Sequence, residues 1–124
     1  MFCDKYYIPN QEGSRLACLL FLPAEKPRFQ LVAAHGFRGA KENSGRIEGF
    51  AQKVTALGGS LIAFDFAGSG ESEGSFSDMT LTRQAGDLQA VIEHALEREK
   101  SPLILLGRSF GGSTVLAAAA REPR

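Results

Sequence analysis

The sequence has little of several features that point to particular functions. It contains only two cysteines, Cys3 and Cys18, with no Cys-x-x-Cys pair and no histidines at zinc-binding spacing. Its 14 basic and 14 acidic residues cancel, so it has neither the basic surface that binds nucleic acid nor an acidic tail. We therefore expect no metal, no cofactor and no nucleic-acid partner, and we interpret both cysteines as packing residues in a reducing compartment.

Long apolar runs are also missing. No stretch has the length of a membrane span, and the first residues, MFCDKYYIPN, lack the basic-then-apolar pattern of a secretory signal. The expectation is a cytoplasmic protein without membrane contact. Hydrophobic residues still make up 44% of the chain, which is typical of a globular domain with a buried core. A small, mostly uncharged ligand fits the balanced charge best.

The remaining pattern is one of strands that alternate with helices. Runs typical of strands lie at 5–8, 15–21, 29–34, 60–64 and 103–106. The first two are separated by turn formers and predict an antiparallel hairpin. Helical spacing is found at 45–57 (Ile47, Phe50, Ala51, Val54, Leu57) and at 80–99 (Leu81, Ala85, Leu88, Ile92, Ala95 or Leu96). We expect a single α/β domain with a mostly parallel sheet and flanking helices.

A loop of small residues, AGSGESEG at 67–74, follows the predicted strand at 60–64. Glycine-rich loops in this position can bind dinucleotides, but that fingerprint spaces its glycines as G-x-G-x-x-G and opens a helix. Here the spacing is G-x-G-x-x-x-G and no helix pattern begins there. The loop is therefore not expected to bind a nucleotide cofactor.

The most informative segment is LILLGRSFGGSTVLAAAA at 103–120, which predicts a strand, a sharp turn and a helix. A Gly-x-Ser-x-Gly turn between a strand and a helix is a nucleophile elbow, and Ser109 stands at its apex. The N–H groups and positive dipole end of the following helix would face a developing oxyanion. An ordinary surface turn is the alternative, and the flanking strand and helix favour the elbow.

Three motifs, each at the end of a predicted strand, resemble the α/β-hydrolase superfamily: HGF at 35–37, DFAGSGES at 65–72 and GRSFGG at 107–112. Within it they are most similar to cinnamoyl or feruloyl esterases and to the serine aminopeptidase and lysophospholipase-like group. This resemblance implies that Ser109 is the nucleophile and that the backbone N–H groups of Phe37 and Phe110 form the oxyanion hole. The pattern departs from the group at Arg108, Phe110 and Ser69, where His, Gln and His are frequent.

The other polar residues near these motifs are expected to be structural. His35 belongs to the HG motif, whose family role is to shape the oxyanion loop, and His94 lies in the middle of a predicted helix, where it would not reach the serine. Asp65 and Asp87 are interpreted as groups that hold loop and helix ends. In the family the triad acid and histidine follow the serine, and only 15 residues follow Ser109.

Residues 1–124 are therefore predicted to form one incomplete α/β-hydrolase domain that ends after the elbow helix. The predicted function is that of a carboxylic-ester hydrolase fragment, with small-molecule ester substrates, that lacks the triad acid and histidine and has little or no activity alone. An amide-cleaving serine peptidase and a catalytically silent module that binds acyl ligands or a partner chain are the alternatives. The strand at Leu103 to Leu106 carries no charge or proline, so we expect self-association or a complementing chain at this edge.

Overall fold

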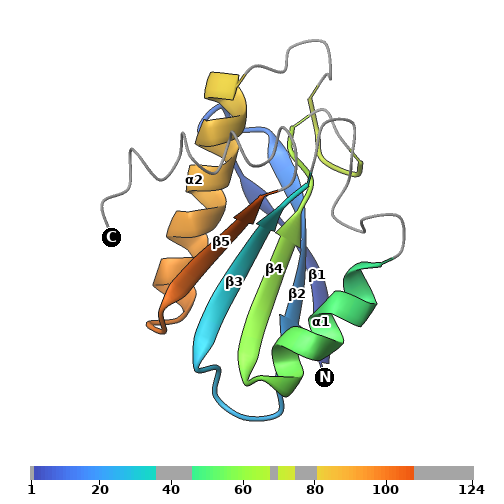
Figure 1. Cartoon of the computed structure of the whole chain (residues 1–124). Coiled ribbons are helices and arrows are strands. Elements are labelled where there is room, and N and C mark those ends of the chain that lie inside the picture. Colours follow the sequence, from blue (N-terminus) through green and yellow to red (C-terminus); the bar gives the residue numbers. More distant parts are fainter. Residues whose placement is uncertain (1, 36–45, 68–69, 75–80, 108–124) are drawn as a thin grey trace.

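The computed structural model describes residues 2–35, 46–67, 70–74 and 81–107, which form one sheet with a helix on each face (Figure 1). The elements are β1 (Phe2–Pro9), β2 (Arg15–Leu22), β3 (Phe29–Ala34), α1 (Ile47–Ala56), β4 (Gly59–Phe64), α2 (Leu81–Arg98) and β5 (Leu103–Gly107). The predicted α/β class is confirmed, and the helix predicted at the end of the 103–120 segment lies outside the described residues.

The strand order across the sheet is β1-β2-β4-β3-β5. The predicted hairpin is present, because β1 and β2 pair antiparallel from Phe2 opposite Leu22 to Pro9 opposite Arg15. β2 also runs antiparallel to β4, whereas β3 is parallel to both β4 and β5. Among the described strands, β2 is therefore the one that runs against the others, and the ends of β3, β4 and β5 share one edge of the sheet (Figure 1).

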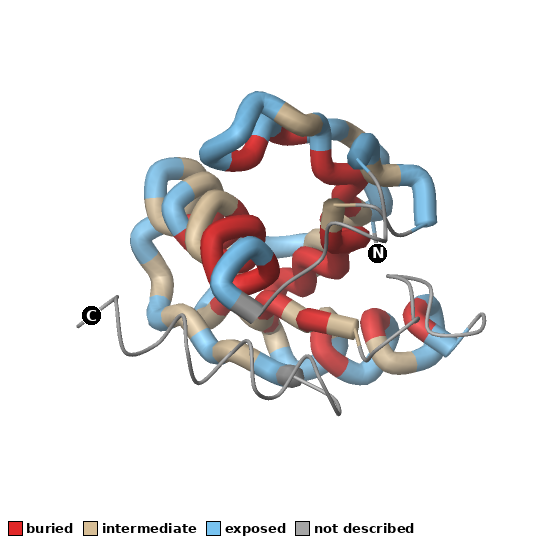
Figure 2. The backbone as a smooth tube through the Cα atoms, turned by 90° about the horizontal axis from the view of Figure 1, so that it is seen from above, coloured by how far each residue is buried: buried red, intermediate tan, exposed pale blue. Residues whose placement is uncertain are grey.

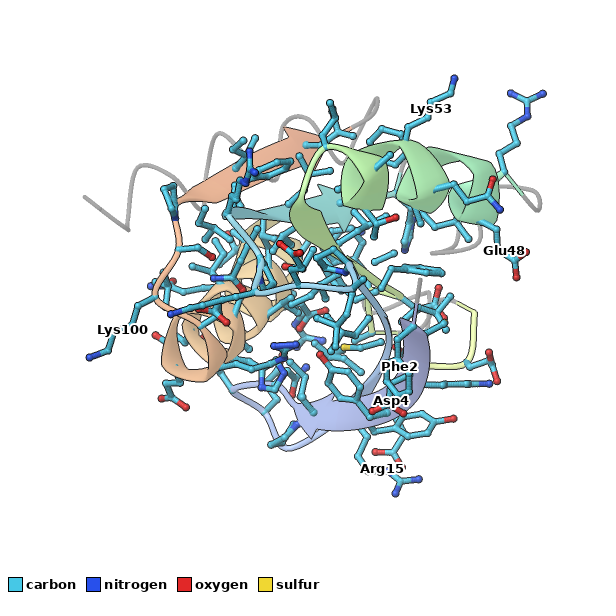
Figure 3. The ribbon with its side chains drawn as sticks, turned by 90° about the horizontal axis from the view of Figure 1, so that it is seen from below. Phe2, Asp4, Arg15, Glu48, Lys53 and Lys100 are labelled. Carbon is cyan, nitrogen blue, oxygen red and sulfur yellow. The ribbon has the colours of Figure 1, made fainter. Side chains whose placement is uncertain are left out.

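Each helix buries one apolar stripe against the sheet, as its 3.6-residue spacing predicts. The core under α2 contains Ile8, Leu16, Cys18, Leu20, Val32, Ala34, Ile62, Phe64, Phe66, Leu88, Val91, Ile92 and Ala95. The core under α1 contains Phe21, Ile47, Ala51, Val54, Leu61 and Ala63. Figure 2 shows this buried centre surrounded by exposed chain. Lys53 of α1 projects away from the sheet (Figure 3).

The end of α1 corrects one expectation about the core. Leu57 was expected to continue the apolar stripe, but its side chain is 71% exposed. The last helical residue is Ala56, and Gly58 adopts φ +87°, the left-handed conformation that ends many helices. Glycine reaches this conformation without a Cβ clash, and β4 begins at the next residue, Gly59. Leu57 therefore lies in the turn between α1 and β4, beyond the last helical residue.

The first strand corrects another. Cys18 is buried in the core under α2, as expected of a packing residue, but Cys3 is exposed. The reason is that β1 is an outer strand of the described sheet, and its first residues belong to neither core. Phe2 beside it is 61% exposed, and Phe2 and Asp4 lie at the outer margin of the molecule (Figure 3). The two cysteines are not joined in a disulfide.

Candidate active site

The candidate site lies where β3, β4 and β5 end, at the carboxyl ends of these three neighbouring parallel strands. Ala34, the last residue of β3, is opposite Phe64 of β4 on one side and Gly107 of β5 on the other. The HGF and GRSFGG segments therefore leave neighbouring parallel strands at the same level of the sheet. Ser109, Phe37 and Phe110 themselves lie outside the described residues. The structure describes the strands and loops that lead to them.

His35 ties the end of β3 to the end of β4. Its Nε2 accepts a hydrogen bond from the backbone N–H of Phe66 at 3.2 Å, and the two rings meet edge to face with centroids 4.8 Å apart. A ring nitrogen that accepts cannot carry the proton, so His35 is the neutral tautomer with its proton on Nδ1. Nε2 of His35 is thus engaged with the backbone. The oxyanion loop that His35 was predicted to shape lies outside the described residues, so that role stays a prediction.

Asp65 is the point around which the loop after β4 closes. The residue is fully buried, and its Oδ2 accepts the backbone N–H of Glu71 at 3.0 Å, while its carbonyl oxygen accepts the Ser72 hydroxyl at 2.6 Å. Gly70 lies directly against the carboxylate with φ +51°, and a Cβ there would be 2.4 Å from the Asp65 Cγ. Only glycine fits at this position, because both the space and the backbone angle exclude a side chain.

The same loop is fastened to β2. The Ser72 hydroxyl accepts the N–H of Ala17 at 2.8 Å, and the N–H of Glu73 donates to the Arg15 carbonyl at 2.9 Å. The Glu73 carboxylate accepts the Arg15 N–H at 2.8 Å, and a second carboxylate, Glu71, pairs with Lys5. The N–H groups of Glu71 and Glu73 are thus both engaged within the protein.

Asp87 of α2 holds this loop from the other side. It is 3% exposed, and its two oxygens accept the Ala67 N–H and the Asn10 side-chain N–H, each at 2.9 Å. Asn10 shapes the hairpin turn, since its side-chain oxygen accepts the N–H groups of Glu12 and Ser14. Burial raises the pKa of Asp87, and the hydrogen bonds from Ala67 and Asn10 oppose that rise. Asp87 therefore joins helix, loop and hairpin, as predicted for a structural carboxylate.

His94 lies next to β1, the outer strand at the opposite edge of the sheet from β5. Its Nε2 is 2.9 Å from the Tyr6 hydroxyl of β1, and the ring centroids are 5.2 Å apart. β1 and β5 are the two outer strands of the described sheet. Burial lowers the pKa of His94, and Arg98 lowers it further. Ser109 lies outside the described residues, so the exclusion of His94 as the general base stays a prediction.

Several of these contacts were not expected from the sequence. The Asn10–Asp87 and Tyr6–His94 pairs join residues 77 and 88 positions apart, and only the folded sheet brings them together. Gly70 and Ser72 both belong to the DFAGSGES motif that the sequence singled out. Their contacts with Asp65 were not predicted from that motif. The described residues contain no cluster of His, Cys, Asp and Glu that could hold a metal ion. No helix in the described part of the chain is long and apolar enough to cross a membrane.

The fold and the arrangement of this edge define an α/β-hydrolase, with the HGF and GRSFGG segments leaving adjacent parallel strands. The family model described as serine aminopeptidase, S33 matches residues 25–124, and the chain belongs to this family. It is 31% identical to a monoglyceride lipase of Homo sapiens over 124 residues, covering 97% of this chain and 39% of that protein. A monoacylglycerol lipase of Mycolicibacterium smegmatis is 33% identical over 90% of this chain and 39% of its own length.

Among solved structures, the ferulic-acid complex of Est1E from Butyrivibrio proteoclasticus is similar in fold. The TM-score is 0.85 and the identity 28%, with 95% of this chain and 48% of that chain covered. Residues 1–124 thus span about two fifths of the curated relatives' length and about half of this structure. The predicted membership of the α/β-hydrolases is confirmed.

Proposed function

We propose that this chain supplies the nucleophile and oxyanion hole of a serine hydrolase that cleaves carboxylic esters. Ser109 Oγ would attack the ester carbonyl, and the N–H groups of Phe37 and Phe110 would stabilise the negative oxygen of the tetrahedral intermediate. The alcohol would leave with the serine proton, and water would then release the acid from the acyl-enzyme. Membership of a hydrolase family and the similarity to lipases support this proposal.

The observation that carries the proposal is the register of β3 and β5. Because Ala34 is opposite Gly107, the residues that follow each strand begin about 4.8 Å apart, the spacing of neighbouring strands. Ser109 is two residues beyond Gly107 and Phe37 is three beyond Ala34. A serine and an oxyanion-hole N–H must both lie about 3 Å from one reacting carbonyl group, so this starting distance suits them.

The general base must come from outside residues 1–124. The chain has two histidines, of which His35 accepts the Phe66 N–H and His94 lies at the opposite edge of the sheet. Asp65 and Asp87 are engaged by buried hydrogen bonds. Loss of triad members leaves only about 10³- to 10⁴-fold catalysis over water in serine proteases. We therefore expect the 124-residue chain alone to be nearly inactive.

Esters of small or aromatic acids are the proposed substrates, because the described strands and loops match a protein crystallised with ferulic acid. Monoacylglycerols are a second ester class, favoured by the names of two relatives. An amide-cleaving peptidase would use the same groups, and the description of the family model favours it. A silent acyl-binding module would use the same edge of the sheet without turnover.

A chimaera tests the function, with residues 1–124 in place of the matching part of Est1E so that the rest of Est1E completes the domain. We expect hydrolysis of methyl ferulate and p-nitrophenyl butyrate, and a loss of roughly 10⁴-fold or more in Ser109→Ala. His94→Ala is the matched control and should retain activity. A folded chimaera that is inactive, or one indifferent to Ser109→Ala, would refute the proposal. Monoacylglycerol and amino-acid p-nitroanilides assayed in parallel separate the substrate classes.

A further inference from the structure

The chain that leaves β4 is held at three consecutive residues by three different parts of the fold. The backbone N–H of Asp65 donates to a carbonyl group of β2 at 2.9 Å. The next N–H, that of Phe66, donates to His35 Nε2 at 3.2 Å. The third, that of Ala67, donates to Asp87 Oδ2 of α2 at 2.9 Å. Neighbouring peptide planes are rigid and share one Cα, so a shift of the Ala67 N–H also turns the Phe66 N–H.

The Phe66 side chain leaves little room to absorb such a shift. It is fully buried, and its ring meets the rings of Phe64 and His35 edge to face, each with centroids 4.8 Å apart. Protein interiors are close-packed, so a displaced buried ring displaces its neighbours. A change at Ala67 would therefore reach the His35 imidazole by two routes, the Phe66 N–H and the Phe66 ring.

The carboxylate of Asp87 is an unfavourable group to bury at this position. It is 3% exposed and accepts the neutral N–H groups of Ala67 and Asn10, and within the described part of the chain its partners include no cation. Burying a charge without a cationic partner destabilises a fold more than burying a neutral acceptor does. A carboxylate does, however, make shorter and stronger hydrogen bonds than a neutral acceptor. Asp87 thus fixes the Ala67 N–H more firmly than an amide would.

We propose that Asp87 is a positioning residue for the hydrolytic reaction, because it holds the His35 imidazole in place through the Phe66 backbone. This inference rests on the proposed function, in which the N–H of Phe37 stabilises the oxyanion. Phe37 follows His35 by two residues, so anchoring the His35 ring anchors the start of the segment that carries this N–H. Asn10 belongs to the same arrangement, since its side-chain N–H orients the Asp87 carboxylate from the hairpin turn.

Exchanging the amide and the carboxylate between positions 10 and 87 tests this role. Asp87→Asn alone turns an amide N–H toward the Ala67 N–H or toward the Asn10 amide, and Asn10→Asp alone brings two carboxylates together. In the double variant, the amide at position 87 can accept the Ala67 N–H and donate to the new carboxylate at position 10. Each single substitution should therefore disturb the arrangement, and the two together should restore it.

The first readout is the tautomer of His35 in the 124-residue chain, measured by NMR of its ring nitrogens. The chain has two histidines, so His94→Gln assigns the signals. Neutral His35 should carry its proton on Nδ1 in the wild type, should shift in part to the Nε2-protonated form in each single variant, and should return to Nδ1 in the double variant. Val91→Ala is the matched control, because it creates a cavity in the core under α2 without removing any of these hydrogen bonds. It should lower the unfolding temperature and leave the tautomer unchanged.

The second readout is hydrolysis of methyl ferulate by the chimaera with Est1E. Each single variant should lower kcat about 10- to 100-fold and change KM less than about twofold, because an oxyanion-hole donor acts mainly in the transition state. The double variant should recover most of this loss. Asn10→Ser is a milder substitution that leaves Asp87 its bond with Ala67, and it should give a smaller decrease in the same direction. It provides the comparison if a stronger variant does not fold.

Three results would overturn the proposal. One is a His35 tautomer that the single substitutions leave unchanged, and another is a folded double variant that recovers neither the tautomer nor kcat. The third is a tautomer shift in Val91→Ala as large as that in Asp87→Asn, which would make the effect one of general destabilisation. An inactive wild-type chimaera refutes the proposed function, whereas an active wild type with fully active single variants refutes the positioning role alone.

Discussion

Replacing Asp87 with alanine tests whether this buried carboxylate joins helix, loop and hairpin. The substitution removes the acceptor of the Ala67 N–H and of the Asn10 side-chain N–H, both bonded at 2.9 Å. A buried donor left without a partner costs about 1–3 kcal/mol, so we expect a loss of about 2–5 kcal/mol in the free energy of unfolding. Urea unfolding followed by circular dichroism measures it. Glu93→Ala, an exposed position on the same helix, should change nothing measurable.

The pH dependence gives a second readout at the same position. Burial raises the pKa of Asp87 in the folded state, so its neutral form is favoured there more than in the unfolded chain. The stability that this shift contributes is complete below the unfolded pKa of about 3.9 and is lost as the pH rises through the raised folded pKa. Asp87→Asn cannot titrate, so the wild type should lose stability relative to it over that window. An Asp87→Ala variant as stable as Glu93→Ala, or a difference from Asp87→Asn that is flat with pH, would refute the reasoning.

Three further outcomes are expected. Gly70→Ala should cost about 1–3 kcal/mol, because its Cβ would meet the Asp65 carboxylate at a backbone angle of φ +51°, and unchanged urea unfolding would contradict this. Iodoacetamide should modify exposed Cys3 in the native chain and modify Cys18 only after unfolding, which mass spectrometry distinguishes. An NMR titration should give His94 a pKa below its usual value, because burial disfavours its charged form, and a normal or raised value would contradict the burial that the Tyr6 contact implies.

The strands and helices were predictable because each carries its own period of hydrophobic residues. β3 was predicted at its observed bounds, and the described residues of the expected faces of α1 and α2 are buried or partly buried except Leu57. The prediction that Leu57 belongs to the buried face was wrong because the hydrophobic spacing continues past Ala56, the last residue of the helix, to the turn at Gly58. The prediction that Cys3 is a packing residue was wrong because the sequence does not reveal that its strand lies at the edge of the sheet. The strand order with β4 between β2 and β3 was not predicted either.

The candidate site could be predicted only as far as local motifs reach. The sequence indicated that HGF and GRSFGG follow strands, but the adjacency of those strands is a property of the register, in which Ala34 is opposite Gly107. The hydrogen bonds around Asp65 could not be predicted from the sequence either. Ala17 belongs to the hairpin, yet its N–H and carbonyl group bind Ser72 and Asp65. Contacts between such distant residues depend on the whole sheet and leave no local pattern.

The place of β3 in the sheet has a consequence for the growing chain. Gln30 pairs with Ser60 on one side and with Leu103 on the other, so β3 is complete only when β5 has been synthesised. At about 5–20 residues per second, the ribosome takes roughly 4–15 s to add the 73 residues from Gln30 to Leu103. During that time the edge of β3 that pairs with β5 has no partner strand from this chain. We expect nascent chains stalled before Leu103 to bind chaperones and to be cleaved by protease more readily than chains stalled well beyond it, and equal protection of the two would contradict this order.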